Sequence, residues 1–343
     1  TLFTSDFLTE SIQQEDVWQS LGEDEVDGLR DRLAAIYERF PKHLTPNETQ
    51  TEDGVIWPVL QALGWDSYLR QQNLSARGRD DIPDGLLFAD ETQLDRANQF
   101  AEEYRRYGLG LAIVESKRWQ RPLDRGSGRR GEEMAPSTQM LRYLRRIEDL
   151  TTGNLRWGIL TNGRRWRLYY GRARSVSEQF FEIDLAAVLG LEGFGDDLFA
   201  LTEDEKRHWL RVFILVFRRA AFLPAATDTR SFHERAIEQG RFYEKKVAAD
   251  LSDLVFNNVY PELVRAIYAA APEEPLDTVR ESALILLYRL LFILYAEDRD
   301  LLPVNDSRYN DYGLRDRVRI DVKLRKDNND VFSKSAARYW SIL

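Results

Sequence analysis

We infer the fold from residues 109–119, Leu-Gly-Leu-Ala-Ile-Val-Glu-Ser-Lys-Arg-Trp. The apolar, partly β-branched run at 111–114 predicts a buried strand. Glu115 and Lys117 follow, and a spacing of two places both side chains on one face of a strand. Upstream, Asp84 opens a second short apolar run that ends at Phe88. We therefore expect one carboxylate from the first strand beside a carboxylate–lysine pair from its neighbour.

This set of side chains suits the hydrolysis of a phosphodiester. Two carboxylates hold a divalent cation that binds the phosphate and activates a water, while an ammonium group stabilises developing charge. Asp80 and Asp81 compete with Asp84 for the role of ligand. Asp84 is preferred because it directly abuts the apolar run.

Two further segments lie in order behind these strands. A helix is predicted from Pro136, with Ser137 or Thr138 as its N-cap, and Gln139 and Tyr143 are four residues apart on one face of it. Residues 155–170 predict a strand, an Asn-Gly hairpin turn at 162–163 and another strand, and residues 179–185 predict an edge strand.

Pro83-Asp84 followed by Glu115-Ser116-Lys117 resembles the PD-(D/E)XK nuclease motif. The Gln-x-x-x-Tyr element and the hairpin sequence Thr-Asn-Gly-x-x-Trp-x-Leu-Tyr are similar to the same branch of nucleases, found in type I restriction motor subunits and their single-chain relatives. The resemblance covers roughly residues 45 to 185. It implies a Mg²⁺-dependent DNA endonuclease, with Mn²⁺ as an expected substitute.

The resemblance also implies roles for individual residues. Asp84 and Glu115 would ligate the metal, and Lys117 would orient or activate the water and stabilise charge. Gln139 would position Lys117 or the scissile phosphate. A glutamate from the first helix approaches the metal site in such domains: Glu48 is the first choice here and Glu52, four residues on, the alternative. An ordinary acidic first turn, favoured by the helix dipole, explains these glutamates equally well.

The charge distribution favours a phosphate-bearing partner despite a net charge of −9. Residues 101–174 contain 17 Arg/Lys and 8 Asp/Glu, a local charge of +9. A basic segment around the predicted site is the electrostatic footprint expected for phosphates, and the resemblance implies that they belong to double-stranded DNA. The expected DNA contacts are Arg118, Arg142, Tyr143, Arg145 and Arg146. Solvated helix faces are the alternative.

The composition excludes several other classes of site. The chain of 343 residues has no cysteine, which removes disulfides, thiolate metal sites and cysteine nucleophiles. Its three histidines are far apart, so each is expected to be a surface or packing residue. The longest apolar run, 283–295, contains Arg289 and is too short for a bilayer. These features favour a cytoplasmic protein without a membrane partner, and the resemblance to restriction enzymes implies that it is bacterial or archaeal.

The expected fold class is α/β: a restriction-endonuclease-like mixed sheet flanked by helices, followed by an all-α domain. Residues 1–41 are expected to form a helical extension, 42–185 the nuclease, and 186–343 a helical domain. The last part is similar to the connector of type IIG restriction–modification enzymes. That resemblance implies a longer protein with methyltransferase and target-recognition domains, S-adenosylmethionine as their cofactor, and a transient dimer on DNA.

Two alternatives remain open from the sequence. The nuclease part of a type I motor subunit shares these motifs, but the chain has no Gly-x-x-x-x-Gly-Lys-Ser/Thr loop. A catalytically silent DNA-binding module would keep the fold, but it has no chemical need for Asp84, Glu115 and Lys117 together.

Overall fold

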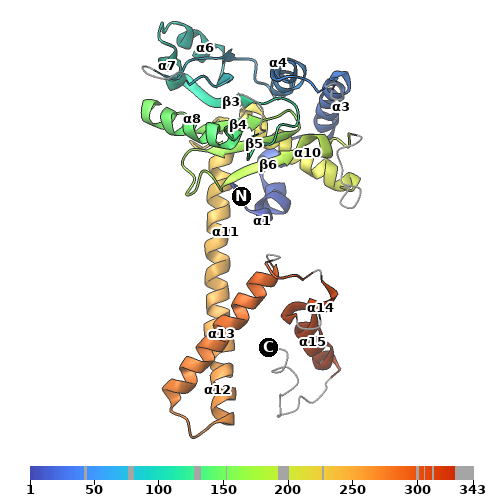
Figure 1. The fold of residues 1–343 in the computed structure, drawn as a ribbon, viewed down its shortest axis with the longest axis vertical. Helices are drawn as coiled ribbons and strands as arrows, with labels where there is room; N and C mark the ends of the chain where they lie inside the picture. Colours follow the sequence, from blue (N-terminus) through green and yellow to red (C-terminus); the bar gives the residue numbers. More distant parts are fainter. Residues whose placement is uncertain are drawn as a thin grey trace. The chain divides into compact units, whose positions relative to one another are not determined.

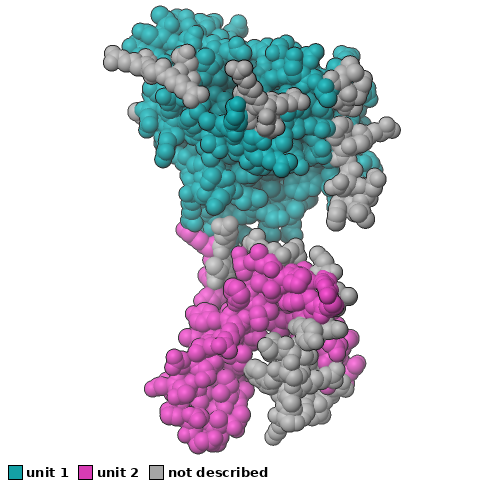
Figure 2. Space-filling model, viewed as in Figure 1, with its two compact units in different colours: residues 1–243 teal, residues 244–343 magenta. Residues whose placement is uncertain are grey.

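The computed structural model describes residues 1–41, 45–75, 81–126, 133–151, 153–191, 201–225, 228–298, 301–304, 306–310 and 313–328. The chain divides into two compact units, residues 1–243 and 244–343 (Figure 2). The boundary lies within one helix, α11 (Phe232–Leu254). The expected boundaries at 41/42 and 185/186 both fall inside unit 1.

Unit 1 contains a six-stranded mixed sheet, which confirms the predicted α/β class. The strands lie in sequence order, and only β3 and β4 are parallel. Their connection contains the helix α8 (Pro136–Thr151), since a parallel pair requires a crossover. The strands are β1 (Tyr68–Arg70), β2 (Gly85–Phe88), β3 (Gly110–Ser116), β4 (Trp157–Thr161), β5 (Arg165–Tyr170) and β6 (Phe180–Asp184).

Both faces of this sheet are covered, because alternate side chains of each strand enter different cores. Ala112 and Val114 of β3 pack with α3 (Glu23–Arg39), α5 (Trp57–Ala62) and α10 (Glu203–Phe217). Ile113 packs on the other face with α8 and α6 (Glu91–Asn98). Figure 1 shows α8 lying along the sheet. The N-terminal and α10 segments therefore belong to the same core as the sheet.

Local signals explain where several helices begin. A continuous helical segment runs from α4 (Glu48–Thr51) through the π-helical turn η3 (Glu52–Ile56) into α5, where Pro58 lies in the first turn. Proline lacks an N–H donor, which suits a first turn and disturbs the turn before it. The prediction that Ser137 or Thr138 caps α8 is wrong. Pro136 is already helical, and the Gln139 N–H donates to the Ala135 carbonyl at 3.2 Å.

The remaining described elements are helical. In unit 1 they are α1 (Ser5–Thr9), η1 (Ser11–Gln14), α2 (Asp16–Gln19), α7 (Glu103–Arg106), η4 (Tyr107–Leu109), α9 (Leu185–Val188) and η5 (Arg219–Phe222). In unit 2 they are η6 (Val255–Val259), α12 (Tyr260–Ala270), α13 (Leu276–Asp298), α14 (Ser307–Asn310), η7 (Leu314–Val318) and α15 (Arg319–Asp327). Among the described residues, no helix has the length and apolar character needed to cross a membrane.

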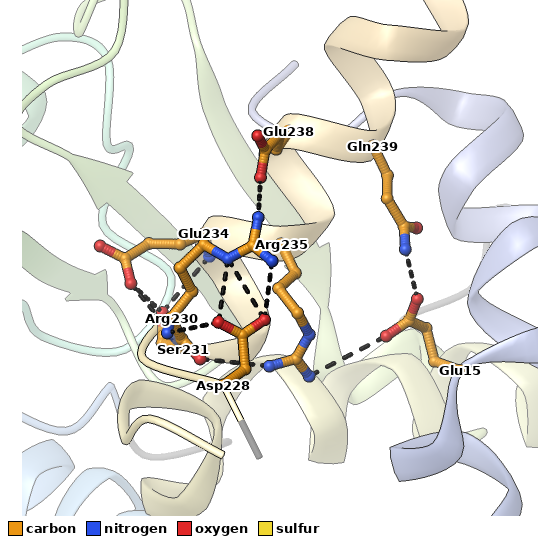
Figure 3. Close-up of polar contacts among 8 residues, drawn as sticks. All are labelled: Glu15, Asp228, Arg230, Ser231, Glu234, Arg235, Glu238 and Gln239. Atoms are coloured by element: carbon orange, nitrogen blue, oxygen red, sulfur yellow. Dashed lines mark hydrogen bonds and ion pairs between the residues drawn. The ribbon is translucent and has the colours of Figure 1, made fainter. Parts of the chain in front are cut away.

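The start of α11 is held by a network of polar contacts within unit 1 (Figure 3). Ser231 and Glu234 exchange backbone and side-chain hydrogen bonds, as in a capping box. Arg230 pairs with Asp228 at 2.8 Å, and Gln239 donates to the carboxylate of Glu15 at 2.7 Å. Glu15 lies between η1 and α2, so its contacts with Gln239 and, at 3.9 Å, with Arg235 attach the start of α11 to that segment.

Candidate active site

The pairing of β2 with β3 brings Asp84 beside Glu115. The two strands are antiparallel, with Gly85 opposite Val114, so the residue before β2 meets the last residues of β3. The Ser116 N–H donates to Asp84 Oδ2 at 2.7 Å. The structure therefore brings together the two carboxylates that the sequence nominates, at one end of the sheet.

Lys117 completes this group from the residue after β3. Its Nζ donates to Glu115 Oε1, and its backbone N–H donates to the Thr161 carbonyl at 2.8 Å. The side chains of Glu115 and Lys117 are 1% and 5% exposed, so the ion pair is shielded from water. The other carboxylate oxygen, Glu115 Oε2, is buried and accepts no hydrogen bond from any described residue. Thus one oxygen of this buried carboxylate lacks a hydrogen-bond donor among the described residues.

Burial and mutual repulsion change the proton affinity of these groups. Burial, then the charge of Glu115, raises the pKa of Asp84 well above its usual range. Burial raises the pKa of Glu115 to about 7, although Lys117 opposes this shift. Burial alone would lower the pKa of Lys117, but the charges of Glu115, Asp84 and Glu48 outweigh it and raise the pKa. The negative charges of Asp84 and Glu115 repel each other in this buried site, and a cation bound between them would relieve the repulsion.

The two candidate glutamates of the first helix have different surroundings. Glu48 begins α4 behind a capping box formed by Asn47. Its Oε1 lies 3.9 Å from Lys117 Nζ, and its Oε2 accepts the Arg118 N–H at 3.3 Å. Glu52 is instead paired with Arg70, and burial raises its pKa. The structure therefore places Glu48 beside Lys117 and pairs Glu52 with Arg70, although the charge of Glu52 still helps to raise the pKa of Asp84 and of Glu115.

Gln139 and Tyr143 lie on the same face of α8 and contact each other. Gln139 Nε2 donates to the Tyr143 hydroxyl at 2.7 Å, and this hydroxyl donates to the Ile82 carbonyl at 3.4 Å. Ile82 lies two residues before Asp84. Tyr143 is 2% exposed, and burial raises its pKa to about 12. The direct contacts of this pair thus support the segment that carries Asp84.

The predicted DNA-contacting arginines of α8 fall into two groups. Arg142 Nη2 lies 2.9 Å from Asp81 Oδ1, and Arg146 pairs with the same carboxylate and donates to Ser75 Oγ at 2.7 Å. Arg145 is exposed and forms no ion pair with a described residue. Asp81, 4% exposed, therefore binds arginines and is no competitor to Asp84. The other competitor, Asp80, lies outside the described residues.

Sequence reasoning missed Arg121 in this region. Its side chain is 6% exposed, with Nη1 4.0 Å from Glu48 Oε2 and Nη2 donating to the Met134 carbonyl at 3.3 Å. Asn162 of the hairpin turn holds the Arg121 carbonyl at 2.8 Å. Arg121 begins a stretch of the sequence that is rich in Gly and Arg, and residues 127–132 of this stretch lie outside the described residues.

The described residues contain no group of three or more His, Cys, Asp or Glu side chains arranged to hold a metal. Asp84 and Glu115 supply two carboxylates. Two are enough for Mg²⁺, which keeps several waters and is commonly bound by one or two carboxylates plus substrate phosphate. The lack of a hydrogen-bond donor at Glu115 Oε2 fits this cation, and so do the raised pKa values of Asp84 and Glu115.

Comparison with family models, curated proteins and solved structures finds no match to this chain.

Proposed function

We propose that this chain is a Mg²⁺-dependent DNA endonuclease with a PD-(D/E)XK fold. The observation that carries the proposal is the convergence of Asp84, Glu115 and Lys117 at the paired ends of β2 and β3. In this group, Glu115 Oε2 has no hydrogen-bond donor among the described residues. A silent module gains nothing from this arrangement, because a buried carboxylate oxygen without a hydrogen-bond donor costs stability. Catalysis or metal binding offsets that cost.

In this proposal, Asp84 and Glu115 hold Mg²⁺, with Mn²⁺ as a substitute and Glu48 assisting from α4. The cation, when bound, polarises the phosphate and lowers the pKa of a bound water. Lys117 lies between Glu115 and Glu48, so its ammonium group can orient an attacking water and stabilise negative charge that develops on the phosphate. Gln139 and Tyr143 maintain the position of Asp84 through the Ile82 carbonyl.

The biological setting rests on the resemblance described above. We infer the nuclease part of a cytoplasmic type IIG restriction–modification enzyme, acting on double-stranded foreign DNA. Arg118 and Arg145 would then contact DNA phosphates. Sequence recognition, adenine methylation with S-adenosylmethionine and any transient dimer would depend on the methyltransferase and target-recognition parts of the longer protein.

Conservative substitutions test the assignment. We expect Asp84→Asn, Glu115→Gln and Lys117→Gln each to lower plasmid cleavage in Mg²⁺ by about 10²-fold or more, since each removes a charge from the reacting centre. Lys117→Gln keeps a donor for Glu115 and so should preserve the fold. Asp84→Asn and Glu115→Gln should also abolish the increase in melting temperature that Mg²⁺ produces.

The matched control is Asp66→Asn, which neutralises an exposed carboxylate of the same unit. Its cleavage rate should equal that of the parent protein. Full activity in Lys117→Gln would refute the assigned mechanism. DNA binding without Mg²⁺-dependent cleavage in the parent protein would indicate the silent module.

A further inference from the structure

A cavity with charged walls lies in unit 1, outside the candidate active site. Its volume is about 340 Å³, and α3, the end of α5, α10 and η5 form its walls. Its lining combines apolar and charged side chains, among them Leu29, Leu63, Glu25, Arg32, Arg218 and Arg219. Arg219 donates to the Ala89 carbonyl, just after β2, whereas Asp84 lies just before that strand. Asp84 and Ala89 are five residues apart along this strand, which corresponds to about 16 Å at about 3.3 Å per residue.

The cavity contains more positive charge than its carboxylate balances. Three arginines and one carboxylate, Glu25, line the cavity, and neither Arg32 nor Arg218 forms an ion pair with a described residue. Arg218 is half-buried, and its Nε is buried without a hydrogen-bond acceptor among the described residues. Burial lowers the pKa of Arg218 although the charge of Glu25 opposes that shift. The guanidinium of Arg218 is therefore partly buried, and the charge of Glu25 acts on it without forming an ion pair.

Another buried arginine of the same unit shows the contrast. The Arg167 side chain is 3% exposed, and it pairs with Asp124 at 2.6 Å and also with Glu182. Its charge is therefore compensated by two carboxylates. Burying a charge without such partners is costly, and a ligand of opposite charge removes that cost. Arg218 is only half-buried, but it has no paired carboxylate among the described residues.

The walls of the cavity are set by backbone contacts. The Arg219 N–H donates to the Leu63 carbonyl at 3.1 Å, which joins η5 to the end of α5. The Arg218 N–H donates to the Ile214 carbonyl at 3.0 Å. Both arginines therefore start from fixed backbone positions, and a ligand would find the site largely formed. Pre-formed sites lose less affinity to the ordering of side chains.

We propose that this cavity binds a phosphate group, with Arg32 and Arg218 as the cationic ligands and Arg219 in its wall. The planar guanidinium fork matches phosphate oxygens in pairs. The volume exceeds that of a single phosphate, and the apolar wall at Leu29 and Leu63 can cover an organic group. A phosphate monoester of nucleotide size and a DNA backbone phosphate share this chemistry.

Melting temperatures of the whole chain, measured without Mg²⁺, test the proposal. Inorganic phosphate, adenosine monophosphate and a short DNA duplex are titrated separately, with NaCl of equal ionic strength as the reference. We expect stabilisation of the parent protein, and at least tenfold weaker binding by Arg218→Met. The matched control is Arg105→Met, which removes an exposed arginine and should bind as the parent does.

A second readout separates binding from a structural role. Without ligand, Arg218→Met should melt at a higher temperature than the parent, because it removes a partly buried charge that forms no ion pair with a described residue. The proposal would be overturned if the phosphate-bearing ligands raised the melting temperatures of Arg218→Met and of the parent protein equally. It would also be overturned if NaCl of equal ionic strength raised the melting temperature of the parent protein as much as these ligands do. Binding of phosphate or the monophosphate identifies a small ligand, and binding of the duplex alone identifies a backbone phosphate. Asp84→Asn should bind normally, which separates this result from the nuclease assignment.

Discussion

At the scale of single residues, three buried ionisable groups of unit 1 differ in how their charge is balanced. Arg167 is surrounded by carboxylates, and Glu115 is half-satisfied by Lys117. His233 is neutral: burial lowers its pKa to about 3, and its Nε2–H donates to the Val216 carbonyl at 2.7 Å. Its ring lies 4.5 Å from that of Phe222. The prediction of a packing histidine is therefore confirmed at this position.

His233 makes the fold sensitive to acid. The unfolded chain binds a proton on this histidine below a pKa of about 6.5, whereas the folded chain does so only near 3. Between these values the unfolded state holds more protons, so the free energy of unfolding falls as the pH falls, by up to about 1.4 kcal/mol per pH unit. Urea unfolding at pH 7, 5.5 and about 4.5 measures this loss.

The comparison variant is His233→Gln, whose neutral amide keeps a donor for Val216. Its stability should decrease less between pH 7 and about 4.5 than that of the parent protein. Equal pH dependence in the two proteins would contradict the role given to His233.

At the scale of elements, the hairpin between β4 and β5 joins three other segments near the candidate site. Gly163 has a φ of +81°, and its carbonyl accepts the Tyr37 hydroxyl of α3 at 2.5 Å. A Cβ at this position would lie 2.9 Å from the Trp119 ring and 3.1 Å from the Thr51 methyl. Thr51 Oγ1 in turn accepts the Trp119 N–H at 2.9 Å. The turn therefore fixes the chain just after Lys117.

Gly163→Ala should disturb both stability and activity. A left-handed backbone costs a non-glycine residue about 1–2 kcal/mol, and the added methyl must also displace Trp119. We expect thermal unfolding to report at least this loss, and cleavage to fall further because Lys117 shifts. Gly108→Ala is the control, since nothing lies within 4 Å of the added Cβ. Similar stability of the two variants would show that the turn tolerates a side chain.

At the scale of the whole molecule, an acidic chain carries a basic region around the candidate site. The net charge is −9, and the arginines of α8 lie beside the segment that leads into Asp84. Arg142 and Arg146 are occupied by Asp81, so replacing them would also loosen this segment. Arg145 is exposed and is the cleaner probe of phosphate contact.

Binding of the chain to duplex DNA should weaken steeply with salt, because cations at phosphates release condensed counter-ions. Arg145→Glu should weaken binding to all sequences alike and reduce the slope of log affinity against log salt by about 1. Fluorescence anisotropy at several salt concentrations measures both effects. Arg265→Glu, at an exposed residue of unit 2, should leave the slope unchanged. Affinity that is independent of salt would contradict the role assigned to the basic region.

The sequence by itself determined the local structure of this protein. Apolar runs indicated β3 and the strand after Asp84, Asn-Gly indicated the hairpin, and the spacing of two placed Glu115 beside Lys117. These signals succeed because strand alternation and turn geometry depend on neighbouring residues. The cap of α8 was the local failure, since proline at the first helical position outweighed the hydroxyl residues after it.

Only the tertiary structure decided which distant groups meet. It placed Glu48 rather than Glu52 beside Lys117, assigned Arg142 and Arg146 to Asp81, and brought Arg121 to the site. It also joined α10 to the sheet and left one oxygen of Glu115 without a donor. Such pairings depend on which segments pack together and on how much water they exclude, and the spacing of residues along the chain encodes neither.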